Sequence, residues 1–317
     1  MAIDILSIQP STISKDLREK YVLLSGPPKI GKTEFCTLCP DALILAFEKG
    51  TNARPGAMVQ TIEKWSDFKL VLRQLDKAEA KKKFATICID TITIAYDACE
   101  KFICAQAGVQ KIGDIPYGGG YSALSKEFEN SLRQITMMGY GLIMTCHLRE
   151  VQDADGRMVG AQPDLNNRCL KIVNGLVDII GVITQTWNEK GESERWIQTR
   201  ATPTIVAGSR FKYLEPRIRF GYNEFVQALA KAIEEEERHG AVVVEKNERS
   251  SEEKIDFKTV RSEAEALWAK LVGENEENAN IILKKIEILM GRKMRLSEFT
   301  EDQADLLSLV VNDMRDI

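Results

Sequence analysis

The segment Gly26-Pro27-Pro28-Lys29-Ile30-Gly31-Lys32-Thr33 fits the pattern GxxxxGK[ST], known as the P-loop. It follows an apolar run, Tyr21 to Ser25, that predicts a strand, and it opens a predicted helix that ends at Pro40. The glycines let the backbone wrap closely around phosphates, so that several N–H groups can point at them. Lys32 is expected to reach the β and γ phosphates, and the Thr33 hydroxyl to ligate Mg²⁺. The whole segment is therefore predicted to bind a nucleotide, with ATP and Mg²⁺ as the expected ligands.

Outward from the P-loop, apolar runs alternate with segments in which apolar residues recur at helical spacing. Strands are predicted at 42–47, 84–89 and 140–146, and helices near 65–75, 92–107 and 124–135. Strands separated by helices imply an α/β fold, with a mainly parallel central sheet flanked by helices. The pattern then changes to a polar hairpin around Asp155-Gly156 and two strands at 177–186 and 194–199. These strands are predicted to extend the sheet in the antiparallel sense, before a last helix at 223–236.

The sequence predicts three segments. Residues 1–236 carry the alternating pattern and form the core. Residues 237–254 are rich in charged side chains around one short apolar run and are predicted to be a linker. Residues 255–317 contain three helical patterns and predict a small all-α domain. These patterns lie near 256–272, 278–290 and 301–315.

Composition and charge exclude several classes of protein. Of the 317 residues, 28% are charged and 44% hydrophobic, as in globular rather than disordered chains. No apolar run is long enough to span a membrane, and the first residues lack the pattern of a secretory signal. Seven cysteines, an odd number, suit a reducing compartment, so a cytoplasmic location is expected. The net charge is −4, with +3 over residues 1–230 and −7 over residues 231–317. That is not the charge of a strong general binder of nucleic acid.

Polar residues follow the other predicted strands, where the carboxyl ends of parallel strands meet at one edge of the sheet. Asp90 ends the third strand and is predicted to hold Mg²⁺ together with Thr33. Glu48 follows the second strand and is a candidate to orient or deprotonate the attacking water. His147 follows the fourth strand and could sense the γ phosphate by a hydrogen bond. Each residue also has a structural interpretation: Asp90 as a helix N-cap, Glu48 as a solvated loop residue and His147 as a partly buried side chain.

The P-loop together with Glu48, Asp90-Thr91 and His147 on successive strand ends resembles the core of RecA-like recombinases. In that family the acid after the second strand is the catalytic glutamate. The polar residue at the position of His147 couples the nucleotide state to a DNA-binding loop. The chain more closely resembles phage RecA-like ATPases, which include single-strand annealing recombinases of the Sak type. The likeness covers residues 18–236, and its further signs are Tyr117-Gly118-Gly119-Gly120-Tyr121, Thr145-Cys146-His147, Gly175-Leu176-Val177-Asp178 and Gly208-Ser209-Arg210-Phe211.

The resemblance implies two DNA-binding loops and a cation that acts on a neighbouring subunit. Loops with basic, aromatic and glycine residues can contact phosphates and stack a base. Arg210 is the candidate to reach the γ phosphate of the neighbouring subunit, which makes it the third predicted catalytic residue and implies a homo-oligomer. Plain surface loops and a solvated strand face are the alternatives. The predicted DNA contacts are Lys111, Tyr117 and Tyr121 in the first loop, and Arg149 and Arg157 in the second.

These features predict a Mg²⁺-dependent ATPase of phage DNA recombination, which binds single-stranded DNA and promotes strand annealing or pairing in the cytoplasm of the bacterial host. Through its C-terminal domain it is expected to meet a single-strand-binding protein or another replication or recombination protein. A helicase-type motor or a helicase loader of DNA replication is the alternative. A nucleotide kinase is less favoured, because residues 149–160 hold only two arginines where such enzymes need an arginine-rich lid. A binding module that does not hydrolyse the nucleotide stays open if Glu48 is not catalytic.

Overall fold

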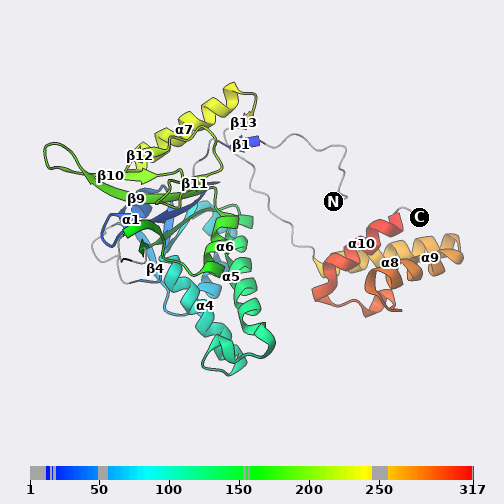
Figure 1. Ribbon diagram of the computed structural model, residues 1–317. Helices are drawn as coiled ribbons and strands as arrows, with labels where there is room; N and C mark the ends of the chain where they lie inside the picture. The colour runs from blue at the N-terminus through cyan, green and yellow to red at the C-terminus, as the bar shows by residue number, and fades with distance from the viewer. Residues whose placement is uncertain are drawn as a thin grey trace. The chain divides into compact units, whose positions relative to one another are not determined.

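The computed structural model describes residues 12–14, 16, 19–48, 56–152, 155, 158–244, 256–315 and 317 (Figure 1). The described residues form two compact units, one within 12–244 and the other within 256–317. One unit is an α/β core and the other is a small group of helices. Within the described ranges, no helix is both long and apolar enough to cross a membrane.

The core is built on one sheet in which most strands are parallel, so the predicted α/β fold is confirmed. The order of its strands is β12-β10-β9-β2-β6-β5-β3-β4, and β11 pairs with β9. The parallel strands are β2 (Tyr21–Ser25), β3 (Ala42–Ala46), β4 (Met58–Thr61), β5 (Thr86–Asp90), β6 (Gly141–Cys146) and β9 (Ile179–Trp187). The antiparallel strands are β10 (Ser193–Gln198), β11 (Gly208–Ser209) and β12 (Arg217–Arg219). The predicted antiparallel extension is therefore right for the strand at 194–199 and wrong for the strand at 177–186, because β9 runs parallel to β2.

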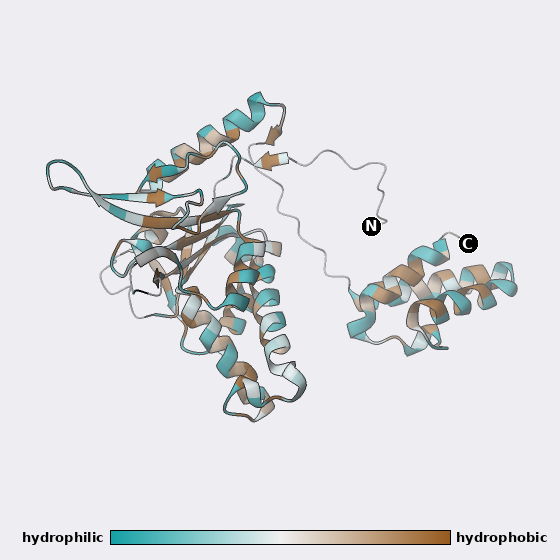
Figure 2. Ribbon diagram, in the orientation of Figure 1, coloured by the Kyte–Doolittle hydropathy of each residue, from teal (hydrophilic) through white to brown (hydrophobic). Residues whose placement is uncertain are grey.

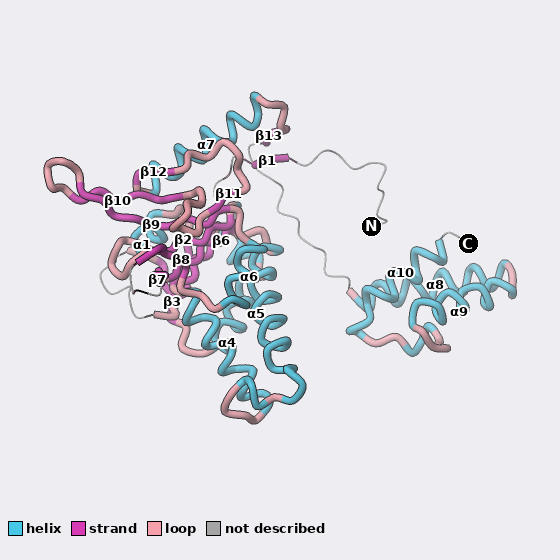
Figure 3. The backbone as a smooth tube through the Cα atoms, viewed as in Figure 1, coloured by secondary structure: helices cyan, strands magenta, loops and turns pink. Residues whose placement is uncertain are grey.

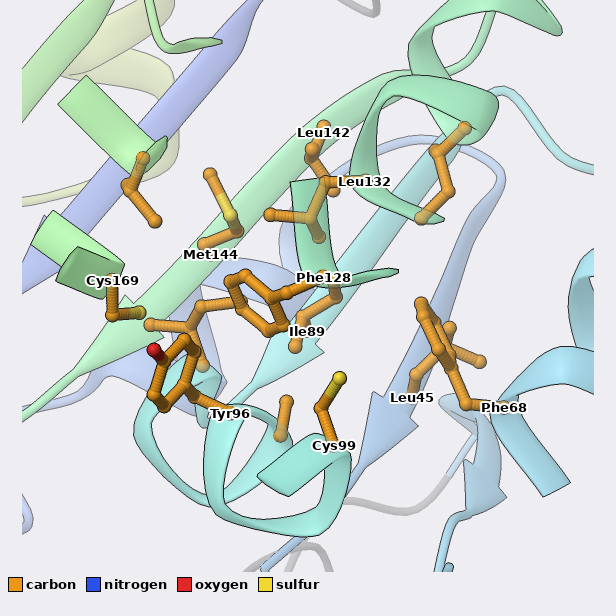
Figure 4. Close-up of a cluster of buried hydrophobic side chains, with 14 of the residues drawn as sticks. Leu45, Phe68, Ile89, Tyr96, Cys99, Phe128, Leu132, Leu142, Met144 and Cys169 are labelled. Carbon is orange, nitrogen blue, oxygen red and sulfur yellow. The ribbon is translucent and has the colours of Figure 1, made fainter. Parts of the chain in front are cut away.

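Helices cover both faces of this sheet, because its central strands are apolar on both sides. Figure 2 shows that the helices themselves carry both hydrophobic and hydrophilic residues. In one apolar layer, Leu45, Ile89 and Met144 of neighbouring strands gather with Phe128 (Figure 4). The helices on that face are α2 (Trp65–Leu75), α4 (Ile92–Ala107), α5 (Gly119–Met137) and α6 (Asn167–Leu176). Those on the other face are α1 (Lys32–Leu38) and α7 (Tyr222–Arg238).

Two of the core elements that the sequence pattern does not predict are short and mostly exposed. The edge strand β4 lies beyond β3, and three of its four residues are exposed. Helix α3 (Ala78–Lys83) has no buried residue. Neither element carries the periodic apolar residues from which buried strands and amphipathic helices are predicted.

The core extends beyond the predicted boundary at residue 236. Helix α7 continues to Arg238, and β13 (Val242–Val244) pairs in parallel with β1 (Thr12–Ser14). Residues 237–238 and 242–244 therefore have regular structure where the sequence predicts a linker. The local pattern does not reveal this strand, because its partner lies at the other end of the core in sequence. The rest of the predicted linker, from residue 245, lies outside the described residues.

The second unit has an apolar core of its own, to which Ile282, Ile286 and Leu307 belong. Its first helix is capped by Asp256, whose carboxylate accepts a hydrogen bond from the Thr259 N–H at 3.1 Å. The apolar spacing in this part of the sequence therefore serves internal packing. The helices are α8 (Phe257–Glu274), α9 (Glu277–Met290) and α10 (Ala304–Arg315), with short 3₁₀ turns η4 (Leu296–Glu298) and η5 (Glu301–Gln303).

Candidate nucleotide-binding site

The P-loop lies between the carboxyl end of β2 and the start of α1, in the context that the sequence predicts. Lys32 is buried, and its Nζ donates to the carbonyl oxygens of Gly26 at 2.8 Å and Pro27 at 2.9 Å. Burial lowers the pKa of Lys32 from its ordinary value, and the nearby carboxylates of Asp90 and Glu48 oppose that shift. The lysine is thus held inside the loop, where a bound phosphate can replace the two carbonyls as its partner.

Asp90 ends β5 and accepts hydrogen bonds from two hydroxyl groups. Thr33 Oγ1 donates to its Oδ2 at 2.7 Å, and Thr145 Oγ1 donates to its Oδ1 at 2.5 Å. Thr145 is directly opposite Asp90 in the neighbouring strand β6, and Thr33 reaches the carboxylate from the P-loop. A carboxylate beside a hydroxyl supplies oxygen ligands of the kind that Mg²⁺ takes at phosphate sites. The two predicted metal-binding residues, Thr33 and Asp90, therefore fit this ion.

Glu48 and His147 meet beside the lysine. The N–H groups of Phe47 and Glu48 both donate to the Asp90 carbonyl, at 2.8 and 3.2 Å, which brings the end of β3 to the end of β5. Glu48 Oε2 lies 3.6 Å from His147 Nε2, and His147 Nδ1 lies 3.4 Å from Lys32 Nζ. The ammonium group can only donate, so a hydrogen bond between these two nitrogens requires Nδ1 as the acceptor and leaves Nε2 to face Glu48. His147 therefore connects the candidate water-activating residue with the P-loop lysine.

His147 also joins the site to a small antiparallel hairpin. Strand β7 (Leu148–Gln152) begins at the next residue and pairs with β8 (Met158–Pro163). The N–H of Asp164, directly after β8, donates to the His147 carbonyl at 2.8 Å. Both ends of the hairpin are thus tied to the residue that contacts the P-loop.

Arg195 is a residue of the site that no sequence motif indicates. It belongs to β10, which forms with β9 a hairpin that extends past the other strands (Figure 3). Its Nη1 donates to the Ile30 carbonyl at 2.6 Å, and its guanidinium lies over the Phe220 ring, 4.5 Å from the centroid. Gly31 has φ 116°, and a Cβ there would lie 2.7 Å from Nη1, so this approach requires glycine. The contact depends on the pairing of β10 with β9, which local patterns do not show.

Arg210, the third predicted catalytic residue, lies near the amino ends of the parallel strands, whereas the P-loop lies at their carboxyl ends. It follows β11, which pairs with the first residues of β9, at the amino end of the parallel strands. Its guanidinium forms an ion pair with Asp178 at 3.2 Å and donates to the Gly175 carbonyl at 2.9 Å. The structure therefore does not bring Arg210 to the nucleotide site of its own chain. Its action on a neighbouring subunit stays a prediction.

The first predicted DNA-binding loop lies at the far end of the pair formed by α4 and α5 (Figure 1). It contains two 3₁₀ turns, η2 (Ile112–Asp114) and η3 (Pro116–Gly118). Lys111 is exposed, and the Tyr117 side chain projects fully into solvent. Tyr121 is instead half-buried, with the Arg168 guanidinium 4.2 Å above its ring. Lys111 and Tyr117 are thus available to a partner, whereas Tyr121 already packs within the chain.

The second predicted DNA-binding loop corresponds to the hairpin of β7 and β8. Arg149 is exposed on β7, opposite Gln162 of β8. Arg157 lies outside the described residues. Arg149 follows His147 by two positions, which makes it the predicted DNA contact nearest in sequence to the nucleotide site.

A cavity of about 650 Å³ opens beside Glu48. Its lining is mostly apolar and includes Phe47, Trp65 and Phe102. Burial raises the pKa of Asp97, one of its acidic residues, against the opposing charge of Lys101. No P-loop residue lines this cavity, so it adjoins the glutamate without being the phosphate site.

The chain is similar to known proteins in three comparisons. In the first, the chain is 28% identical to the SPbeta prophage-derived uncharacterized protein YorG of Bacillus subtilis (strain 168), over 333 residues that cover 100% of this chain and 99% of that protein. In the second, the crystal structure of the flagellar accessory protein FlaH from Methanocaldococcus jannaschii is 12% identical, with 64% of this chain and 85% of that chain covered. The two structures share a TM-score of 0.34. In the third, the model of a family described as "AAA domain" matches residues 18–211, which include the P-loop, Glu48, Asp90 and His147. The chain therefore belongs to this AAA domain family of P-loop ATPases.

Proposed function

We propose that the protein is a Mg²⁺-dependent ATPase of phage DNA recombination, which binds single-stranded DNA and promotes strand annealing or pairing. The observation that carries the proposal is the position of His147. Its ring lies between Lys32 and Glu48, and the next residue begins the hairpin of β7 and β8. A change at the γ phosphate can therefore act through His147 on the hairpin, which bears the exposed Arg149.

The arrangement suits ATP hydrolysis. Catalysis of this reaction needs a positioned water molecule and groups that stabilise charge on the transferred phosphoryl group. Lys32 and the P-loop N–H groups supply the stabilisation. Thr33 and Asp90 hold Mg²⁺, which when bound neutralises charge on the β and γ phosphate oxygens. Glu48 orients the water and accepts its proton as the bond to the γ phosphorus forms and the bond to the β-phosphate oxygen breaks, leaving ADP and phosphate.

His147 is placed to report the outcome of hydrolysis. A bound triphosphate draws the Lys32 ammonium towards its own oxygens, which frees Nδ1 of His147 from its 3.4 Å contact with Nζ. Loss of the γ phosphate restores that contact. Because the His147 carbonyl accepts the N–H of Asp164, a shift of this residue acts on both ends of the hairpin. Hydrolysis can therefore alternate the hairpin between two positions.

The DNA-binding part of the proposal is supported by exposed side chains and by the phage relative. Arg149, Lys111 and Tyr117 are exposed, and basic and aromatic groups can contact phosphates and stack on bases. The prophage origin of the similar protein supports a phage setting. We also propose that the chain acts as a homo-oligomer in which Arg210 serves a neighbouring site. In this scheme the helical unit recruits a single-strand-binding protein or another replication or recombination protein.

Fluorescence anisotropy of a labelled single-stranded oligonucleotide tests the proposal. We expect tighter binding with AMP-PNP and Mg²⁺ than with ADP, and faster annealing of complementary strands in the tighter state. Lys32→Ala should abolish the difference between the two nucleotides. Absence of binding to single-stranded DNA in both states would contradict the recombination role and favour a helicase loader that is activated by a protein.

A further inference from the structure

We infer that Arg195 and Phe220 form the platform on which the base of the nucleotide stacks, so that strand β10 supplies the nucleoside side of the site. The inference rests on the proposed function, because it assumes that ATP binds at the P-loop. It follows from the direction in which the nucleotide must lie and from the way in which the Arg195–Phe220 pair is built.

The groups that would handle the γ phosphate all lie on one side of β2. Asp90, Glu48 and His147 lie at or just after the ends of β5, β3 and β6, and these strands continue the sheet on that side. The strands on the other side of β2 are β9 and then β10. With the γ phosphate near Glu48, the ribose and base have to extend across the P-loop towards β9 and β10.

Arg195 lies next to the P-loop, on the side towards which the ribose and base would extend. Ser25, the last residue of β2, pairs with Val182 of β9, and Arg195 pairs with Gln185, three residues further along that strand. The side chain thus projects from beyond the carboxyl edge, next to the P-loop, and donates to the Ile30 carbonyl at 2.6 Å. It lies on the side of the sheet where α1 begins, since its Nη1 is also 4.0 Å from Oε2 of Glu34.

The guanidinium is held as a fixed plane. Phe220 packs against Phe35 of α1 with ring centroids 6.2 Å apart, and its N–H donates to the Arg195 carbonyl at 2.8 Å. The guanidinium lies over this ring, 4.5 Å from its centroid, while Nη1 is bound to the P-loop carbonyl. One face and one edge of the group are therefore occupied by the protein.

The remaining surface of the guanidinium is available to a ligand. The Arg195 side chain is 38% exposed, and that of Glu34 is 40% exposed. A guanidinium plane stacked on an aromatic ring offers a second face on which a planar base can stack. Glu34, directly after Thr33, is placed to accept a hydrogen bond from a ribose hydroxyl. The pair therefore suits the nucleoside part of a nucleoside triphosphate.

A merely structural role for Arg195 predicts a different behaviour. If the side chain only held the Ile30 carbonyl, its loss would weaken every ligand of the P-loop equally. Inorganic tripolyphosphate carries the phosphates of ATP without ribose or base, so it separates the two roles.

The test is the affinity of the full-length protein for AMP-PNP and for tripolyphosphate, each with Mg²⁺, by isothermal titration calorimetry. We expect Arg195→Ala to weaken AMP-PNP binding about tenfold and tripolyphosphate binding by less than about twofold. Arg195→Lys keeps the charge but loses the plane, so it should show the same selective loss even if the alanine variant folds poorly. Arg217→Ala is the matched control, because it removes a guanidinium that stacks on Trp196 of the same strand β10. It should bind both ligands as the wild type does.

Equal losses for the two ligands, or no loss for either, would overturn the inference while leaving nucleotide binding at the P-loop intact. Lys32→Ala is the control for binding at the P-loop itself, because this variant should lose both ligands. Wild-type protein that binds neither ligand would refute the proposed function and the inference together.

Discussion

The Thr33 hydroxyl donates to the Asp90 carboxylate at 2.7 Å, although β2 and β5, the strands that lead to these residues, are not neighbours in the sheet. Strand β6 runs between them and supplies the Thr145 hydroxyl to the other carboxylate oxygen. The carboxylate is therefore fixed from two directions. We therefore expect the Mg²⁺ dependence of ATP turnover to require Asp90.

Asp90→Asn should abolish activation of ATP turnover by Mg²⁺, because an amide binds the ion more weakly than a carboxylate. The loss of turnover should be about 10²-fold or more. The asparagine has almost the same shape, so the melting temperature should change little. The measurement is turnover as a function of Mg²⁺ concentration. Asp97→Asn, on α4, is the control, because Asp97 is an aspartate outside the P-loop. A Mg²⁺ response in Asp90→Asn equal to that of the control would disprove the metal assignment.

Glu48→Gln should lower the turnover of ATP by about 10²- to 10⁴-fold, because glutamine cannot accept the proton of the attacking water. Binding of AMP-PNP should stay within about twofold of the wild type, since Glu48 does not belong to the P-loop. Glu63→Gln is a matched control, because Glu63 lines the same cavity beside Glu48. Turnover that survives in Glu48→Gln would identify Glu48 as a solvated loop residue.

The cysteines should be inert towards thiol reagents in the folded protein. All seven are buried and free, and burial raises the pKa of the Cys146 thiol to about 12. The reactive thiolate is therefore scarce between pH 7 and 9. Labelling with a disulfide reagent should be slow in this range and should reach seven groups only after unfolding. Ser66→Cys, at an exposed position, provides a reactive control, and rapid labelling of the wild type would contradict the burial.

The same pKa shift has a consequence for stability. An unfolded thiol ionises near its ordinary value of 9.0, whereas the buried thiol of Cys146 resists ionisation up to about 12. The unfolded state therefore releases protons first, and the free energy of unfolding should fall as the pH rises from about 9 to 12. Urea unfolding at several pH values measures this dependence. In Cys146→Ser the decrease should be smaller.

Two truncations should separate the core from the linker. A chain that ends after Ser250 keeps the pairing of β13 with β1, whereas a chain that ends after Glu236 loses it together with the end of α7. We expect the shorter chain to be less stable by about 1 kcal/mol or more, which lowers Tm by roughly 2–4 °C for each kcal/mol. Calorimetry of both chains checks this. Equal Tm values would show that β13 contributes nothing to the core.

The predicted phosphate, metal and water-activating residues share one property: each lies at or next to the end of an apolar strand. The P-loop, Glu48, Asp90 and His147 are visible in this way, because a parallel sheet brings the ends of its strands together. Helices of the second unit are visible for a similar reason, since their apolar spacing builds a core. Local patterns thus identified the candidate phosphate and metal residues.

What the sequence does not reveal depends on pairing between distant segments. Arg195 reaches the P-loop only because β10 pairs with β9 beside β2, and β13 is a strand only because it meets β1. Arg210 has the charge expected of a catalytic cation, yet its partners are Asp178 and a carbonyl at the amino edge of the sheet. Residue type alone does not fix the edge at which a side chain lies.

The central claim is that an ATPase site at the P-loop communicates with bound single-stranded DNA. Its most direct test is steady-state ATP turnover by the purified full-length protein, with and without single-stranded DNA, with Lys32→Ala as the control for contaminating activity. We predict turnover that rises several-fold with DNA in the wild type and is absent in Lys32→Ala. Wild-type turnover that is the same with and without DNA would contradict the claim.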